Sequence, residues 1–273
     1  MTQAAAHSTP RIPGTPCWVS LMVHGLGTTE DFYTALFGWE FVPGPDQLGP
    51  YVRALLDGKE VAGIGRLTPD RHLQVTWTPY LATDDADATA ETIRACGGTV
   101  AVGPLDAGTA GRVAICADPL GAVFGIWQAG DHPGTRLSGV PGTPVWNELI
   151  TQECSAVTKF YETVFGHEAR ACEGAEPGED HRTLHLGAGP VASVLGVGRA
   201  LPHDRGPHWM ISFLVADSER AAEVCEANGG RVLHAPDTSQ PGRPAVLADP
   251  EGAVFTVLET PPTAIAPHAA HGA

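Results

Sequence analysis

Apolar and polar residues along the chain follow two alternating periods, and the alternation runs through four cycles. Each cycle predicts a strand, then a helix, then three short strands, because the repeat of apolar positions changes from two residues to about one helical turn and back. In the first cycle residues 18–23 indicate a strand, and residues 28–31 offer capping side chains for a helix that Gly38 can end in a left-handed conformation. The three strands that follow are expected at residues 39–42, 51–56 and 61–67.

The second cycle has the same order. A strand is expected at residues 75–82, a helix capped by Asp84 or Asp85 and closed by Gly97 and Gly98, and strands at residues 99–102, 112–116 and 123–128. One helix for every four strands does not suit a regular parallel α/β sheet. It predicts an α+β fold in which paired βαβββ modules form curved, mixed, mostly antiparallel sheets with helices on their outer faces.

The second half of the chain repeats the first. Five short matches recur in constant order at offsets of 128 to 132 residues: 14–18 with 142–146, 32–38 with 160–166, 97–98 with 229–230, 111–112 with 242–243, and 118–124 with 249–255. The duplication predicts a first domain at residues 14–129 and a second at residues 142–260. A Gly- and Pro-rich linker is expected at residues 130–141, with flexible ends at residues 1–13 and 261–273.

Composition narrows the class of protein. The 273 residues are 43% hydrophobic and 17% charged, which suits globular domains. Sixteen basic residues against 31 acidic ones give a net charge of −15, which disfavours nucleic acid or an anionic membrane as a partner. No apolar run approaches the ~20 residues of a membrane span, and residues 1–13 lack the apolar core of a secretion signal, so a cytoplasmic location is expected. We expect the protein to be a monomer or a homodimer. The six cysteines form no C-x-x-C pair, and reduced thiols are favoured over disulfides.

Two motifs, present in both halves, resemble those of the vicinal-oxygen-chelate superfamily of glyoxalases, bleomycin-resistance proteins and extradiol dioxygenases. They are the Phe-Tyr-x-x-x-Phe-Gly end of the first helix and the Asp-Pro-x-Gly-Ala entry to the last strand. The tandem form, with the phrase at residues 146–149, is similar to a two-domain actinobacterial group that includes a mycobacterial culture-filtrate antigen. The resemblance implies that each domain is a cup whose concave face holds a small molecule, often beside a divalent metal on His and Glu side chains.

The metal positions that the resemblance implies do not carry good ligands here. A hard divalent ion needs three or four His or carboxylate groups that converge on it. The family's positions fall on residues of other kinds, namely Trp18, Thr78 and Gly125 in the first half and Trp146, Met210 and Thr256 in the second. We therefore expect neither a metal nor another cofactor.

Ionisable side chains near these positions occur only in the second half. By the period of two, Glu148 shares a strand face with Trp146, and His208 shares one with Met210, while His185 is a third candidate. The matching residues of the first half are Ser20, Thr76 and Leu55. Glu148, His208 and His185 are the candidate catalytic residues, with Glu148 as general base. The alternatives are a solvated strand residue for Glu148 and a hydrogen-bonded edge histidine for His208.

Aromatic and basic residues supply the candidate ligand contacts. Five of the six tryptophans lie on predicted strands, where they serve either as core or as flat walls of an apolar pocket. Arg112 and Arg243 either hold an anionic substrate or form structural ion pairs. The candidate ligand-binding residues are Trp18, Ser20, Trp77, Trp127, Trp146, Trp209, Met210, Arg112 and Arg243.

The sequence thus favours a metal-independent protein that binds or transforms a small, aromatic natural product or drug-like compound in an apolar cup. Antibiotic biosynthesis or resistance is the setting that the resemblance implies. Whether the ligand is sequestered or undergoes acid–base chemistry stays open. Two alternatives remain: a divalent-metal-dependent enzyme of glyoxalase or dioxygenase type, and a structural module without a ligand.

Overall fold

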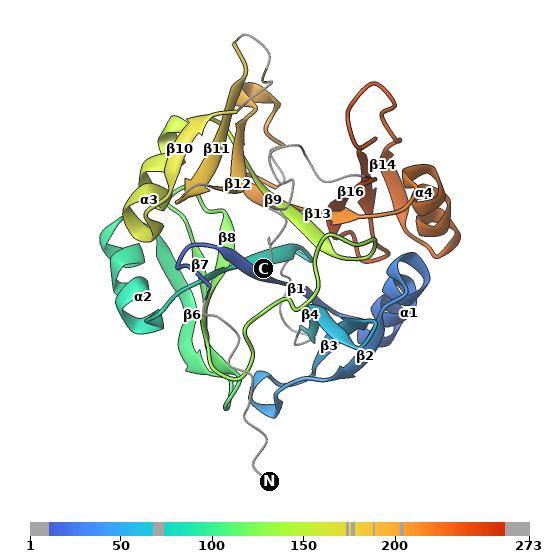
Figure 1. Cartoon of the computed structure of the whole chain (residues 1–273), viewed down its shortest axis with the longest axis horizontal. Helices are drawn as coiled ribbons and strands as arrows, with labels where there is room; N and C mark the ends of the chain where they lie inside the picture. Colours follow the sequence, from blue (N-terminus) through green and yellow to red (C-terminus); the bar gives the residue numbers. More distant parts are fainter. Residues whose placement is uncertain are drawn as a thin grey trace, which may run out of the picture.

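A computed structural model of the chain describes residues 11–67, 74–172, 175, 178–187, 189–202 and 205–259. The tail expected to be flexible at residues 261–273, and all but the last three residues of the N-terminal segment 1–13, lie outside this part. Two tandem domains follow one another along the chain, each built around one eight-stranded sheet (Figure 1). None of the helices in the described ranges is long and apolar enough to cross a membrane.

The first domain holds two βαβββ modules. The first module is β1 (Pro16–Val23), α1 (Leu26–Phe37), β2 (Glu40–Pro43), the short 3-10 helix η1 (Asp46–Leu48), β3 (Tyr51–Leu56) and β4 (Lys59–Arg66). The second module is β5 (Trp77–Ala82), α2 (Ala86–Ala95), β6 (Thr99–Asp106), β7 (Gly111–Ala117) and β8 (Val123–Ala129).

The second domain repeats this order. Its first module is β9 (Pro144–Thr151), α3 (Ser155–Phe165), β10 (Glu168–Ala171), β11 (Asp180–Leu186), β12 (Gly189–Gly196) and the short 3-10 helix η2 (Gly198–Ala200). Its second module is β13 (His208–Leu214), α4 (Ser218–Ala227), β14 (Arg231–His234), β15 (Ala245–Ala248) and β16 (Val254–Leu258).

The two sheets have the same topology. Their strand orders are β2-β3-β4-β1-β5-β8-β7-β6 and β10-β11-β12-β9-β13-β16-β15-β14. The first strand of each module runs parallel to the last, the other ladders are antiparallel, and the antiparallel pairs β1–β5 and β9–β13 join the modules of each domain. The expected α+β fold of paired modules with mixed sheets is therefore confirmed.

Helix α1 begins earlier than its sequence indicates. The expected caps at residues 28–31 lie inside the helix, which starts at Leu26 behind Gly25 and has no side-chain cap of its own. Glu251 of the second domain takes that part, because its carboxylate accepts hydrogen bonds from the backbone N–H groups of His24 and Gly25 at 2.7 and 2.5 Å. At the other end Gly38 adopts the expected left-handed conformation, with φ of 73°.

Among the described residues, the two larger of three hydrophobic cores each combine residues from both domains. Helices α1 and α4 lie next to each other, and α2 lies next to α3 (Figure 1). The first core joins residues of β1, α1 and β4 to residues of β13, α4, β15 and β16, and the second core joins the α2 module to the α3 module. The helix-covered face of each sheet is thus buried against the other domain.

A matched pair of hydrogen-bonded chains crosses this interface. Trp77 donates to the hydroxyl of Tyr33 at 2.9 Å, and Tyr33 donates to Asp249 of the other domain at 3.2 Å. The equivalent residues Trp209, Tyr161 and Asp118 form the same chain in the opposite direction. Burial raises the pKa of both tyrosines and of both aspartates. The repeated Phe-Tyr and Asp-Pro motifs therefore hold the two domains together.

This placement favours the core alternative for Trp77 and Trp209, although both residues also line a cavity between the domains. Their indoles are 1% and 3% exposed and belong to the two cores. Trp77 and Trp209 pair with Leu21 and Leu149, so they point to the helix-covered face and not to the opposite one. The sequence placed these residues next to the cup positions, and a shift of one residue along a strand changes the face.

Candidate functional site

The candidate functional residues lie on the face of each sheet that is turned away from its helices. We define the first cup by Trp18, Ser20, Tyr51, Tyr80 and Trp127, and the second cup by Trp146, Glu148, His181, Ser193 and Met210. The strand registers make the two cups directly comparable. Ser20 pairs with Thr78 and Gly63, and Glu148 pairs with Met210 and Ser193 at the matching places.

The first cup is filled by its own rings. Ser20, which is 1% exposed, donates to the hydroxyl of Tyr80 at 2.9 Å. The Tyr80 ring lies directly over Gly125, where a Cβ atom would collide with it, and the Tyr51 hydroxyl lies over Gly63 in the same way. Glycine is required at both positions because the tyrosines occupy the space of a side chain.

Two tryptophans close the first cup against the interdomain linker. The Trp18 indole donates to the Tyr51 hydroxyl at 3.0 Å, and the Trp127 indole donates to the backbone carbonyl of His132 at 2.8 Å. The His132 ring packs edge-on against both indoles, with centroids 4.6 and 5.6 Å away. The linker thus supplies an aromatic side chain that covers this cup, and each indole is only 6% exposed.

The second cup contains a polar chain in place of the rings. The Trp146 indole donates to Ser193 Oγ at 2.8 Å, and Ser193 Oγ donates to Glu148 Oε1 at 2.8 Å. His181 Nε2 lies 3.0 Å from the same carboxylate oxygen, at ion-pair distance but without the alignment of a hydrogen bond. Within the described residues no partner contacts Glu148 Oε2, so that oxygen stays available as an acceptor.

Both ionisable groups of the second cup are reachable from solvent. The side chains of Glu148 and His181 are 26% and 20% exposed. The Glu148 carboxylate, 3.0 Å from the imidazole, raises the pKa of His181 above its ordinary value, and this outweighs burial, which lowers it. The geometry therefore combines a carboxylate with a histidine that is able to share its proton near neutral pH.

His181 was missed by the sequence analysis, which paired Glu148 with His208 and His185. β11, which carries His181, does not neighbour β9 in the sheet, and only the fold reveals that its side chain spans β12 to reach Glu148. The available signal was its place on β11, four residues before His185 and thus on the same face by the period of two.

The two expected histidines lie elsewhere. His185 stands opposite Glu168 of β10, at the far end of its strand from His181. It occupies the place that Leu55 holds opposite Glu40 in the first domain, as the sequence register predicted. His208 pairs with Ile150 at the start of β13, and its Nδ1 lies 2.7 Å from the carbonyl oxygen of Gly206. Neither histidine has a described contact with Glu148.

The two arginines form structural ion pairs. Arg112 contacts Asp87 and Asp106 at 2.9 and 2.6 Å, and Arg243 contacts Glu219 and Glu259 at 2.5 and 3.0 Å. Each guanidinium thus ties a helix to a strand or loop of its own domain. The structural alternative, and not capture of an anionic substrate, describes both residues.

The metal positions implied by the family do not fit a metal ion. Trp, Thr, Met and Gly offer no set of hard ligands, and the ring of Tyr80 covers Gly125, the first-half position of the implied Glu. Throughout the described ranges no three His, Cys, Asp or Glu side chains are grouped closely enough to hold an ion.

Paired βαβββ modules in two curved eight-stranded sheets define the class of protein, the vicinal-oxygen-chelate superfamily. The sequence profile of the glyoxalase-like domain matches residues 18–127 and 148–258, so the chain belongs to the glyoxalase-like family and contains this domain twice.

Relatives with assigned names cover nearly the whole chain. CFP32 of Mycobacterium tuberculosis, provisionally named a glyoxylase, is 38% identical over 255 residues, 91% of this chain and 96% of its own. The anthracycline biosynthesis protein DnrV of Streptomyces peucetius is 38% identical over 263 residues, which are 90% of this chain and 94% of that one.

Solved structures agree on the fold. The Mn(II)-bound glyoxalase of Novosphingobium aromaticivorans superposes with a TM-score of 0.63 at 18% identity, over 91% of this chain and 83% of its own. The 2,3-dioxygenase LapB of Pseudomonas sp. KL28 has a TM-score of 0.61 at 16% identity, over 91% of this chain and 93% of its own. At these identities the likeness concerns architecture and not the reaction.

Proposed function

We propose that the second cup binds a small aromatic compound of the anthracycline type and that Glu148, with His181, transfers a proton to or from it. The observation that carries the proposal is the chain from Trp146 through Ser193 to Glu148 and His181. Relatedness to DnrV, named for anthracycline biosynthesis, supports the class of ligand.

The roles follow from the contacts. Ser193 and His181 both lie on Oε1, which leaves Oε2 of Glu148 to accept a proton from an acidic O–H or C–H of the ligand. The proton then returns to another atom of the ligand, either from Glu148 or through His181. Trp146 and Met210 flank the carboxylate on the same face and offer the apolar surface on which a flat ring packs.

The test compares the two cups with a hydroxyanthraquinone and an anthracyclinone as probes. Glu148→Gln preserves the shape of the side chain but removes the base, so we expect turnover to be lost while affinity stays within a few-fold of the parent. Ser20→Ala is the matched control in the first cup and should leave both unchanged. Full activity in Glu148→Gln, or total loss of activity in Ser20→Ala, would show that the active site is not in the second cup. Binding without turnover in the parent would reduce the function to sequestration.

The proposed chemistry is metal-independent, which elemental analysis checks directly. Untagged protein should contain well under one equivalent of divalent metal, because the family's ligand positions hold Trp, Thr, Met and Gly. Near-stoichiometric zinc, nickel, manganese or iron that rises and falls with activity would favour the metal-dependent glyoxalase or dioxygenase alternative.

A further inference from the structure

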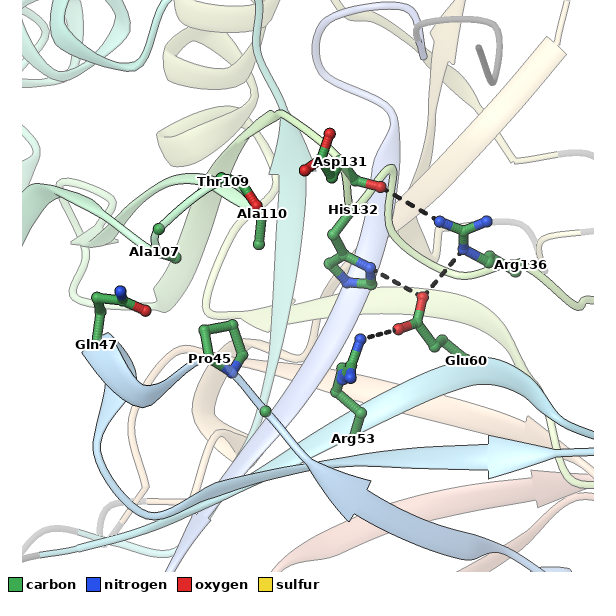
Figure 2. Close-up of a pocket in the computed structure, with 12 residues that line it drawn as sticks. Pro45, Gln47, Arg53, Glu60, Ala107, Thr109, Ala110, Asp131, His132 and Arg136 are labelled. Atoms are coloured by element: carbon green, nitrogen blue, oxygen red, sulfur yellow. Dashed lines mark hydrogen bonds and ion pairs between the residues drawn. The ribbon is translucent and has the colours of Figure 1, made fainter. Parts of the chain in front are cut away.

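A cavity opens at the mouth of the first cup, apart from the proposed site. It has a volume of about 540 Å³, within the range of roughly 300–1,000 Å³ that is typical of small-molecule sites. Its walls come from the loop around η1, from β3 and β4, from the loop between β6 and β7, and from the linker (Figure 2). We call this space the linker cavity.

One wall of the linker cavity is a fixed network around Glu60. Its carboxylate binds Arg53 at 2.5 Å, Arg136 at 3.0 Å and His132 at 3.1 Å (Figure 2). The hydrogen bond from His132 and the nearby charges lower the pKa of Glu60 to about 2, although burial opposes the shift. Glu60 therefore stays ionised over the physiological range of pH, and its ion pairs hold this wall together.

The remaining polar groups of the cavity are available to a ligand. The side chains of Gln47, Thr109 and Asp131 line the space, and none of the three makes a side-chain hydrogen bond or ion pair with another described residue. In Figure 2 Gln47 projects from η1 below the loop that carries Ala107 and Thr109, and Asp131 lies above His132. The free groups are thus one amide, one hydroxyl and one carboxylate.

The charges and the hydrogen-bonding groups of the lining residues indicate the kind of ligand. The two guanidinium groups of Arg53 and Arg136 are matched by the two carboxylates of Glu60 and Asp131, so the lining does not select an ion of either sign. An amide, a hydroxyl and a carboxylate together both donate and accept hydrogen bonds. A neutral ring with several hydroxyl groups satisfies such a set, since each hydroxyl is a donor and an acceptor at once.

We propose that the linker cavity is a carbohydrate site that takes one neutral monosaccharide unit. Asp131 and Gln47 bind its hydroxyl groups, and the apolar side chains of Pro45 and Ala110 pack against its C–H face. The proposal is independent of the acid–base role of Glu148, because no residue is shared between the linker cavity and the second cup.

The experiment titrates isotope-labelled full-length protein with methyl glucoside, methyl galactoside and methyl rhamnoside, and follows amide shifts by NMR. We expect saturable shifts at residues 107–110 and 131–132 for at least one glycoside. Asp131→Asn should weaken that binding about tenfold, in line with the loss of one charge-assisted hydrogen bond. Gln47→Ala is a second variant, and because neither side chain holds another residue, both should fold as the parent does.

A control variant and a comparison of glycosides test the location of the site and the kind of ligand. Glu148→Gln should bind the glycoside as the parent does, which separates this proposal from the function of the second cup. Preferential binding of methyl glucuronide or glucosamine would contradict a neutral ligand, and the absence of saturable shifts at the solubility limit of all three glycosides would overturn the site. Tighter binding of phenyl than of methyl glycosides would identify the sugar as part of an aromatic glycoside, and equal binding would identify a free sugar.

Discussion

The first and second cups share one backbone and differ in what fills it. In the first, Tyr51 and Tyr80 lie over Gly63 and Gly125, and the space is closed. In the second, the equivalent positions carry His181, Ser212, Ser193 and Thr256, as the matching registers show. An exchange of rings over glycines for small polar residues thus converts a packed interior into a polar face.

The two domains are alike where they pack against each other and differ on their cup faces. The helix-covered faces are constrained because each core is shared between the domains, and there the halves stay alike, down to the reciprocal Trp-Tyr-Asp chains. The cup faces do not meet the other domain in these cores, so they were able to diverge without loss of the interface. Specialisation of one cup therefore left the fold intact.

The largest change in stability is expected when equivalent residues of the two cups are exchanged. Gly63→Ser places a side chain into the Tyr51 hydroxyl and should lower the free energy of unfolding by about 3 kcal/mol, the upper range for overpacking. Ser193→Gly only removes hydrogen bonds and should cost about 1 kcal/mol. Urea unfolding measures both.

A rescue experiment checks the cause. Adding Tyr51→His to Gly63→Ser should recover most of the lost stability, since the shorter ring leaves room for the serine. If Gly63→Ser alone is as stable as the parent, the first cup is not filled as described.

The next largest effect concerns Glu60, which has no counterpart in the second half because Pro190 holds its place. The pKa of Glu60 falls from 4.5 to about 2 on folding, so its contribution is full above pH 4.5 and is lost as the pH falls through about 2. Glu60→Gln should destabilise the protein by about 1–2 kcal/mol at neutral pH, a value reduced by nearby solvent. Unfolding at a series of pH values should show the two proteins converge on acidification, and a constant difference would contradict the ion-pair explanation.

A smaller change in stability is expected when the Glu148–His181 pair is removed. The pKa of His181 is raised, so the pair stabilises the fold fully below the ordinary histidine pKa of 6.5 and loses this contribution as the pH rises through the raised value. In Glu148→Gln the histidine pKa should fall, with a stability change below about 1 kcal/mol. Titration of the His181 ring by NMR measures the shift. Ser20→Ala is the control, and an unchanged His181 pKa in Glu148→Gln would exclude the contact.

The smallest expected effect is spectroscopic. Trp146 lies in the proposed site, hydrogen-bonded to Ser193, whereas Trp18 is covered by His132, so a bound hydroxyanthraquinone should quench Trp146 more strongly. Trp146→Phe should remove most of the quenching and Trp18→Phe little of it. The reverse result would assign the aromatic ligand to the first cup.

The sequence determined the modular plan of this protein. The order of periods predicted four βαβββ modules, Gly38 predicted the end of α1, and the register that aligned Leu55 with His185 is the one observed. These features are local or repeated, because a period of two or 3.6 residues and a left-handed glycine depend on few neighbours. The sequence also identified Glu148 as the ionisable residue that distinguishes the second half.

The sheet face on which each of these residues lies, and the side chains that it contacts, follow from the tertiary structure alone. The start of α1 depends on Glu251, more than 200 residues away, and Trp77 and Trp209 belong to cores that no single domain completes. β9 and β11 lie on opposite sides of β12 in the sheet, and at this separation His181 contacts Glu148. His185 lies farther along β11. Such contacts depend on the order of strands in the sheet and on the packing between domains, which the period of a sequence does not encode.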